Sequence, residues 1–173
     1  MSSTPPTPSD TADGVDPWSN LDEAGTGLTV NDFLTTMLAQ LVTALRSSIT
    51  EPYARQFDLT VPEWRLLALL AHGEPMSFAD LVRQATSDKA LVSRTLRLLE
   101  DRGLITLDST GTSPRKRLAC RISPDGAALH AQVMPLARRG QASVIRLLTP
   151  EERHGLYAGL RKLHGLCTGS GKN

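Results

Sequence analysis

Apolar side chains recur at helical spacing along most of the chain from residue 29 onward. The first stripe predicts a helix from Thr29 to about Pro52, because Thr29 and Asp32 have the spacing of a capping box. Tyr53 and Phe57 are expected to continue it after a kink at the proline. The apolar positions of this stripe are Leu34, Leu38, Leu41, Leu45 and Ile49.

Two further helix starts pair a hydroxyl residue with a carboxylate three positions later, and a cap of this kind is typically worth about 1 kcal/mol. The pairs are Thr60 with Glu63 and Ser77 with Asp80. The first of these helices has Pro62 at its expected first position and a stop signal in Gly73 and Pro75. These signals predict two short consecutive helices.

The segment from Asp88 to Ile105, "DKALVSRTLRLLEDRGLI", separates into two faces when it is wound at 100° per residue. The polar face holds Lys89, Ala90, Ser93, Arg94, Arg97, Glu100 and Asp101, and the apolar face holds Leu91, Val92, Thr95, Leu96, Leu98 and Leu99. The cations occupy the first turns, and the carboxylates lie near the exit at Gly103. A helix enters the major groove of DNA by its N-terminal half, where its dipole and its cations meet phosphates and base edges. This polarity predicts a DNA recognition helix.

A β-hairpin is predicted directly after that helix. "LITL" is typical of a short strand, "DSTGTSPRK" of a turn, and "RLACRI" of a returning strand with Leu118, Cys120 and Ile122 on one face. Two helices, a tight turn, an amphipathic helix and a hairpin follow in the order of a winged helix-turn-helix. The fold class is therefore mainly α with a small β-hairpin wing.

Two more helices are predicted after the hairpin. Ser123 and Pro124 begin a long one, which Pro135 is expected to kink, and Thr149, Pro150 and Glu152 cap a last one. The stripe of the long helix is Leu129, Val133, Leu136, Gly140, Val144 and Leu147, and that of the last helix is Leu156, Leu160, Leu163 and Cys167. A small winged domain cannot cover this much apolar surface, so the outer helices are expected to have a partner surface.

The net charge of +1 conceals an uneven distribution along the 173 residues. Residues 83–121 carry 9 basic and 4 acidic side chains, whereas residues 1–32 carry 0 basic and 6 acidic ones. This asymmetry favours a polyanionic partner for one face, although a charged surface that is merely solvated is the ordinary alternative. The N-terminus has neither a secretory signal nor a transit peptide, and the chain has no run long enough to span a membrane, so we expect a cytoplasmic protein.

The predicted DNA contacts lie on the recognition helix and on the wing. Arg94 and Arg97 can reach base edges, while Lys89 is placed to bind a phosphate. Ala90 allows close approach to a thymine methyl, and Ser87 and Ser93 can hydrogen-bond. The hairpin tip adds three adjacent cations, which can follow the minor groove or its phosphates; these are Arg115, Lys116 and Arg117. The alternative for the helix is an ordinary surface helix with arginines for solubility.

No catalytic or metal-binding pattern is found in the sequence. The two cysteines form neither a metal spacing nor a disulfide framework, and the four histidines are scattered. Cys120 is expected to be inert in a strand, and Cys167 to be a small core residue. There is no nucleophile elbow, and no pair of carboxylates has a plausible cleft. We therefore expect no enzyme activity, no catalytic residues, no cofactor and no metal.

The stretch "LTVPEWRLLALLAHGEPMSFADLVRQATSDKALVSRTLRLLEDRGLITL", followed by "RLACRISPDGAAL", resembles the MarR family of bacterial transcription regulators. The resemblance covers residues 31–166. It implies a ligand-responsive repressor that binds a palindromic operator as a homodimer, with half-sites about one turn of DNA apart. One departure is Pro114, which stands where family wings often carry an aspartate before the arginine. The resemblance therefore does not fix the direction of the Arg115 side chain.

Residues 1–28 are rich in Pro, Ser, Thr, Gly and Asp, and are expected to form a disordered acidic tail. With the resemblance, the expected organisation continues with 29–57 as an N-terminal dimerisation helix, 58–122 as the winged helix-turn-helix DNA-binding domain, 123–167 as the C-terminal dimerisation helices, and 168–173 as a disordered tail. Family members respond to small aromatic or phenolic anions, for which Tyr53 and Trp64 are the candidate contacts and Arg65 the counter-charge; the alternative for Trp64 is a core position, which is the more common one for a tryptophan in such a helix. Two alternatives remain: a winged-helix protein-interaction module without a DNA target, and a metal-responsive winged-helix repressor, whose cysteine and histidine clusters are missing here.

Overall fold

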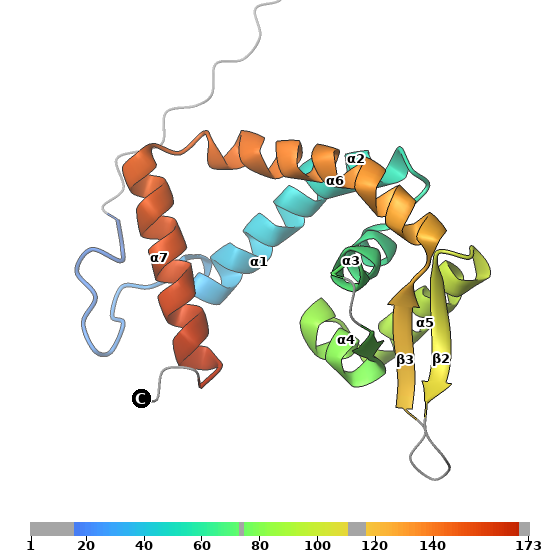
Figure 1. Cartoon of the computed structure of the whole chain (residues 1–173). Helices are drawn as coiled ribbons and strands as arrows, with labels where there is room; N and C mark the ends of the chain where they lie inside the picture. Colours follow the sequence, from blue (N-terminus) through green and yellow to red (C-terminus); the bar gives the residue numbers. More distant parts are fainter. Residues whose placement is uncertain (1–15, 73–74, 111–116, 170–173) are drawn as a thin grey trace, which may run out of the picture. The chain divides into compact units, whose positions relative to one another are not determined.

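The computed structural model describes residues 16–72, 75–110 and 117–169, and residues 1–44 and 45–173 form two compact units. The described chain is mostly helical and contains a small three-stranded sheet (Figure 1). The predicted fold class is confirmed. The tail predictions for residues 1–15 and 170–173 lie outside the described residues.

The first unit is built on a capped turn and one helix. The Asp32 carboxylate accepts hydrogen bonds from the Thr29 N–H at 2.8 Å and from its hydroxyl at 2.6 Å, as the capping-box spacing predicts. The cap opens a 3-10 turn, Val30–Asp32, after which α1 covers Leu34–Leu45. Trp18 joins this start through its indole, which donates to the Asp32 carbonyl oxygen at 2.8 Å.

At the start of the second unit the first predicted helix is interrupted earlier than expected, before Pro52 and not after it. The helix expected to run to Pro52 is divided into α1, the π-helical turn η2, Arg46–Thr50, and α2, Glu51–Arg55. Pro52 has no N–H to donate to the carbonyl four residues earlier, and its ring needs room there. Wider π-helical turns just before the proline relieve this crowding.

Helices α3, Val61–Leu70, α4, Phe78–Ala85, and α5, Lys89–Asp101, form the helical part of the winged domain (Figure 1). The first two begin at the expected caps, Thr60 and Ser77, and α5 is capped by Asp88; each of these side chains accepts a hydrogen bond from a backbone N–H three residues on. Pro62 takes the second helical position of α3 and not the expected first. Local sequence therefore sets where these helices start.

The wing is part of a three-stranded antiparallel sheet in the order β1-β3-β2. The predicted strands are β2, Ile105–Thr110, and β3, Arg117–Ile122, paired so that Leu107 faces Cys120. The added strand β1, Met76–Ser77, pairs with the other edge of β3 and was not predicted, because two residues carry no periodicity. The tip, residues 111–116, lies outside the described residues.

Helix α6, Pro124–Ile145, closes the core from one side. Ser123 caps it as predicted and also donates to the Gly103 carbonyl oxygen at 2.7 Å. Pro135 lies inside α6 without ending it. Gly126 sits so close to the end of the recognition helix that an ideal Cβ there would lie 2.0 Å from the Leu104 carbonyl oxygen.

The core is one cluster of buried side chains from α2 through α6. Leu67, Leu99, Cys120 and Val133 have no exposed surface in it. Burial, together with the nearby charge of Glu100, raises the pKa of the Cys120 thiol to about 11. Cys120 is therefore a protonated core residue, in agreement with its expected inertness.

The last helix, α7, Pro150–Cys167, begins at the predicted cap, where the Glu152 carboxylate accepts from the Thr149 N–H at 2.7 Å. It buries none of its side chains within this chain. Cys167 is exposed, so its prediction as a core residue is wrong: its helix has no core to face here. Among the helices of the described residues, none combines the length and the apolar character needed to cross a membrane.

Candidate nucleic-acid interface and effector cleft

Helix α5 is held by its apolar face. Val92, Leu96 and Leu99 are buried, and Thr95 lies among them with its hydroxyl donating to the Leu91 carbonyl oxygen at 2.8 Å. Leu98, which the helical projection assigned to the same face, is 53% exposed, so that assignment is wrong. The anchoring stripe is therefore narrower than predicted, since Leu98 lies at its edge.

The opposite face of α5 is open to solvent. Lys89, Ala90, Arg94 and Arg97 are exposed, and Ser87 and Ser93 are half-buried. In the part of the chain that the structure describes, Arg94 and Arg97 form no ion pair, so their donors are available. The structure thus brings together on one solvent-facing surface all six residues that were predicted to contact DNA from the helix and its preceding turn.

The structure describes the base of the wing hairpin. Arg115 and Lys116 lie outside the described residues, and Arg117 is the first residue of β3, opposite Thr110. A cation that the sequence analysis did not single out lies on the outer face of the hairpin: Arg121 pairs across the strands with Asp108 at 3.6 Å. Both side chains are about half exposed, so the pair adds little to stability.

The exit of the recognition helix is tied to the start of α3 by Arg102. Its guanidinium donates to the Asp58 carbonyl oxygen at 2.8 Å and to Glu63 Oε1 at 3.1 Å. The other carboxylate oxygen of Glu63 accepts from the N–H and the hydroxyl of Thr60. One buried carboxylate therefore serves both as helix cap and as ion-pair partner, which fixes the C-terminal end of α5 relative to α3.

Of the predicted effector contacts, Tyr53 and Trp64 are core residues. Their rings meet edge to face with centroids 5.9 Å apart, and Trp64 stacks on His130 at 5.5 Å. The His130 Nε2 atom is buried and has no hydrogen-bond partner among the described residues. Its burial, and then the charges of His72 and Arg138, lower the pKa of His130, which favours a neutral ring against the indole.

Arg65, the third predicted effector contact, points elsewhere. Its Nη2 atom donates to the Thr86 hydroxyl at 2.8 Å, in the turn between α4 and α5. Among the described residues, Arg65 therefore bonds to the helix-turn-helix corner, whereas the rings of Tyr53 and Trp64 pack against each other. Thr86 is 21 residues away from Arg65 in the chain, so no local sequence pattern indicates this hydrogen bond.

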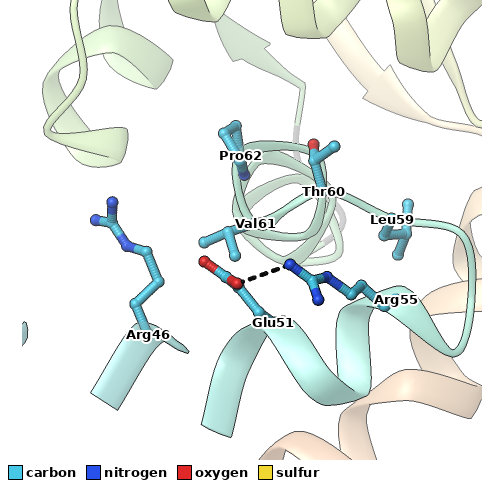
Figure 2. Close-up of a pocket in the computed structure, with 7 residues that line it drawn as sticks. All are labelled: Arg46, Glu51, Arg55, Leu59, Thr60, Val61 and Pro62. Carbon is cyan, nitrogen blue, oxygen red and sulfur yellow. Dashed lines mark hydrogen bonds and ion pairs between the residues drawn. The ribbon is translucent and has the colours of Figure 1, made fainter. Parts of the chain in front are cut away.

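A different cleft lies between the η2–α2 segment and the start of α3 (Figure 2). It has a volume of about 360 Å³ and is lined by Arg46, Glu51, Arg55, Leu59, Thr60, Val61 and Pro62. Arg55 pairs with Glu51 at 3.1 Å, whereas the Arg46 side chain extends into the gap with no ion pair among the described residues. The Arg46 guanidinium beside an apolar wall can bind a small organic anion.

The order of capped helices, the exposed cationic face of α5 and the three-stranded wing define a winged helix-turn-helix protein. Comparison with known proteins agrees: a sequence model of the MarR family matches residues 57–113. The HTH-type transcriptional repressor Rv2887 of Mycobacterium tuberculosis is 31% identical over 96 residues, which are 55% of this chain and 68% of that protein. This chain belongs to the MarR family of winged-helix transcription regulators.

Solved structures show the same fold over most of the chain. The MarR family transcriptional regulator SPO1453 from Silicibacter pomeroyi superposes with a TM-score of 0.69 at 25% identity, covering 81% of this chain and 98% of its own. The complex of Rv2887 with p-aminosalicylic acid gives a TM-score of 0.62 at 26% identity, with 76% and 98% covered.

Proposed function

We propose that this protein is a transcription repressor that binds a palindromic DNA operator as a homodimer and responds to a small aromatic acid. The single observation that carries the proposal is the orientation of α5. Its apolar face is buried, and Lys89, Arg94 and Arg97 project into solvent from its first turns. The alternative, a protein-interaction module without a DNA target, does not explain why α5 carries cations toward its N-terminal end and carboxylates at its C-terminal end.

The homodimer is supported by the apolar surface of the outer helices. Large hydrophobic side chains are 40% or more exposed on both α1 and α7. On α1 they are Met37, Leu41 and Val42, and on α7 they are Leu156, Tyr157, Leu160, Leu163 and Leu166. Monomeric proteins rarely leave contiguous apolar surface of this kind in water. A second copy that covers these helices would place two winged domains to read a two-fold symmetric site.

The effector proposal rests on the cleft at Arg46. A carboxylate would bind the Arg46 guanidinium, and a ring would lie against Leu59, Val61 and Pro62, which line the same cleft. A relative of this chain, Rv2887, has been solved with p-aminosalicylic acid, which has this combination of a carboxylate and an aromatic ring. This cleft replaces the predicted set of Tyr53, Trp64 and Arg65 as our proposed effector site.

DNA binding is tested by titrating the protein onto the DNA upstream of its own gene over a series of salt concentrations. Each phosphate neutralised by a Lys or Arg should add about 0.9 to the slope of log affinity against log salt. We expect a steep slope and a complex that contains two copies of the chain, measured by analytical ultracentrifugation. A flat slope, or no binding at low salt, would favour the protein-interaction alternative.

Effector binding is tested by calorimetric titration with p-aminosalicylate. Replacing Arg46 with methionine keeps the aliphatic stem and removes the charge, and should weaken binding about tenfold, as expected for one charge-assisted hydrogen bond. Arg139→Met is the comparison variant, since Arg139 lies on α6 and lines a separate cleft beside Tyr53, not the cleft at Arg46. Equal losses in the two variants would show that the cleft at Arg46 is not the site.

A further inference from the structure

Arg65 lies at the helix-turn-helix corner although it belongs to α3. It is exposed on its helix, and its guanidinium donates through Nη2 to the Thr86 hydroxyl at 2.8 Å. Thr86 ends α4 in a left-handed conformation, with φ +49°, and its own hydroxyl donates to the Ala85 carbonyl oxygen. The side chain is therefore fixed at a rigid point of the turn that leads into the recognition helix.

This fixed guanidinium keeps most of its donors. An arginine has five N–H donors in a planar fork, and the hydrogen bond to Thr86 uses one of them. Within the described residues, Arg65 takes part in no ion pair. A guanidinium that is held in place by a neutral hydroxyl, and is otherwise exposed, retains its full charge for an external anion.

The neighbouring charges leave the corner positive. Lys89 follows Thr86 by three residues and is exposed, and Arg83 is already paired with Asp80 at 2.7 Å. The nearest carboxylate in the turn is Asp88, and one of its oxygens accepts the Leu91 N–H as the cap of α5. Arg65 and Lys89 are therefore the available cations on the two sides of this turn.

We infer that Arg65 is a DNA-backbone contact that positions the recognition helix, and that the DNA surface extends from α5 across the turn onto α3. The inference rests on the proposed DNA binding. Phosphate contacts set the register and orientation of a protein on the duplex without reading sequence. A cation anchored on α3 would bind a phosphate beside the point where α5 enters the groove, and so would fix the depth and angle of Arg94 and Arg97.

The test compares salt dependence in three variants of the full-length protein, on the operator and on an unrelated duplex of equal length. Arg65→Met should lower the slope of log affinity against log salt by about 0.9 per bound subunit. It should also lower the affinity for both duplexes by the same factor, about fivefold per subunit at 0.15 M salt. Arg65→Lys should recover most of the slope, because a lysine also neutralises a phosphate. Arg139→Met, with the same change of charge on α6, should leave the slope close to that of the wild type.

Each other outcome has a definite meaning. If Arg65→Met weakens binding with an unchanged slope, Arg65 only supports the turn, and the inference is wrong. If Arg139→Met lowers the slope as much as Arg65→Met, overall charge and not a local contact is responsible. Absence of binding by the wild-type protein at any salt concentration overturns the proposed function itself, which separates that failure from failure of the Arg65 contact.

Discussion

Replacing both Arg94 and Arg97 with alanine is expected to lower the affinity for the operator about a hundredfold or more while the fold stays intact. Each bidentate contact of an arginine with a guanine is worth roughly 1 to 3 kcal/mol of discrimination. Both side chains are exposed and form no ion pair among the described residues, so their removal leaves the core unchanged. Fluorescence anisotropy with the operator and with an unrelated duplex measures the effect on affinity and on specificity.

The far end of the same helix supplies the control. Glu100 and Asp101 are exposed in the last turn, where the helix is expected to have left the groove. The double variant Glu100→Gln with Asp101→Asn should bind the operator as tightly as the wild type, or somewhat more tightly. If this variant loses as much affinity as the arginine variant, or if the arginine variant keeps its preference for the operator, our orientation of α5 on DNA is incorrect.

Gly126→Ala is expected to lower the free energy of unfolding by about 3 kcal/mol, at the upper end of the usual cost of overpacking. The added Cβ would lie 2.0 Å from the Leu104 carbonyl oxygen and 3.0 Å from Ile122 Cγ1. The carbonyl cannot easily move away, because it accepts the Ser123 N–H at 3.1 Å. Urea unfolding followed by circular dichroism measures the change.

Gly155 in α7, unlike Gly126, has open space around it within the chain. Within one chain nothing lies within 4 Å of a Cβ added there, so at protein concentrations at which the monomer predominates Gly155→Ala removes only the entropic penalty of a helical glycine. This variant should gain about 0.5 to 1 kcal/mol in the same urea experiment. Equal stability changes for the two glycine variants would contradict the close contact between α6 and the segment after α5.

Sequence alone predicted the features that depend on neighbours in the chain. The caps at Thr60, Ser77, Ser123 and Thr149 were correct because a capping side chain and its backbone partner are three residues apart. The two faces of α5 followed from helical periodicity in the same way. The order of the predicted elements indicated a winged helix-turn-helix, and the family resemblance, which the comparisons confirm, agreed with it.

Features that depend on distant partners could not be predicted. The bond of Arg65 to Thr86 spans 21 residues, and that of Arg102 to Glu63 spans 39. Trp64 gave no sign in the sequence that it would pack against His130, and the cleft at Arg46 depends on how η2 and α3 pack. The exposed face of α5 that we propose to bind DNA could therefore be predicted from the sequence, whereas the cleft that we propose for the effector could not.

The short strand β1 connects the wing to the helix-turn-helix. Because β3 bonds on one edge to β2 and on the other to β1, whose Ser77 caps α4, the hairpin and the first helix of the helix-turn-helix share a continuous backbone network. In the proposed complex with DNA, a force that bends the hairpin against the duplex would be transmitted to α4 and to the turn that leads into α5. Contact of the wing with DNA and insertion of α5 into the major groove would accordingly occur as one concerted motion.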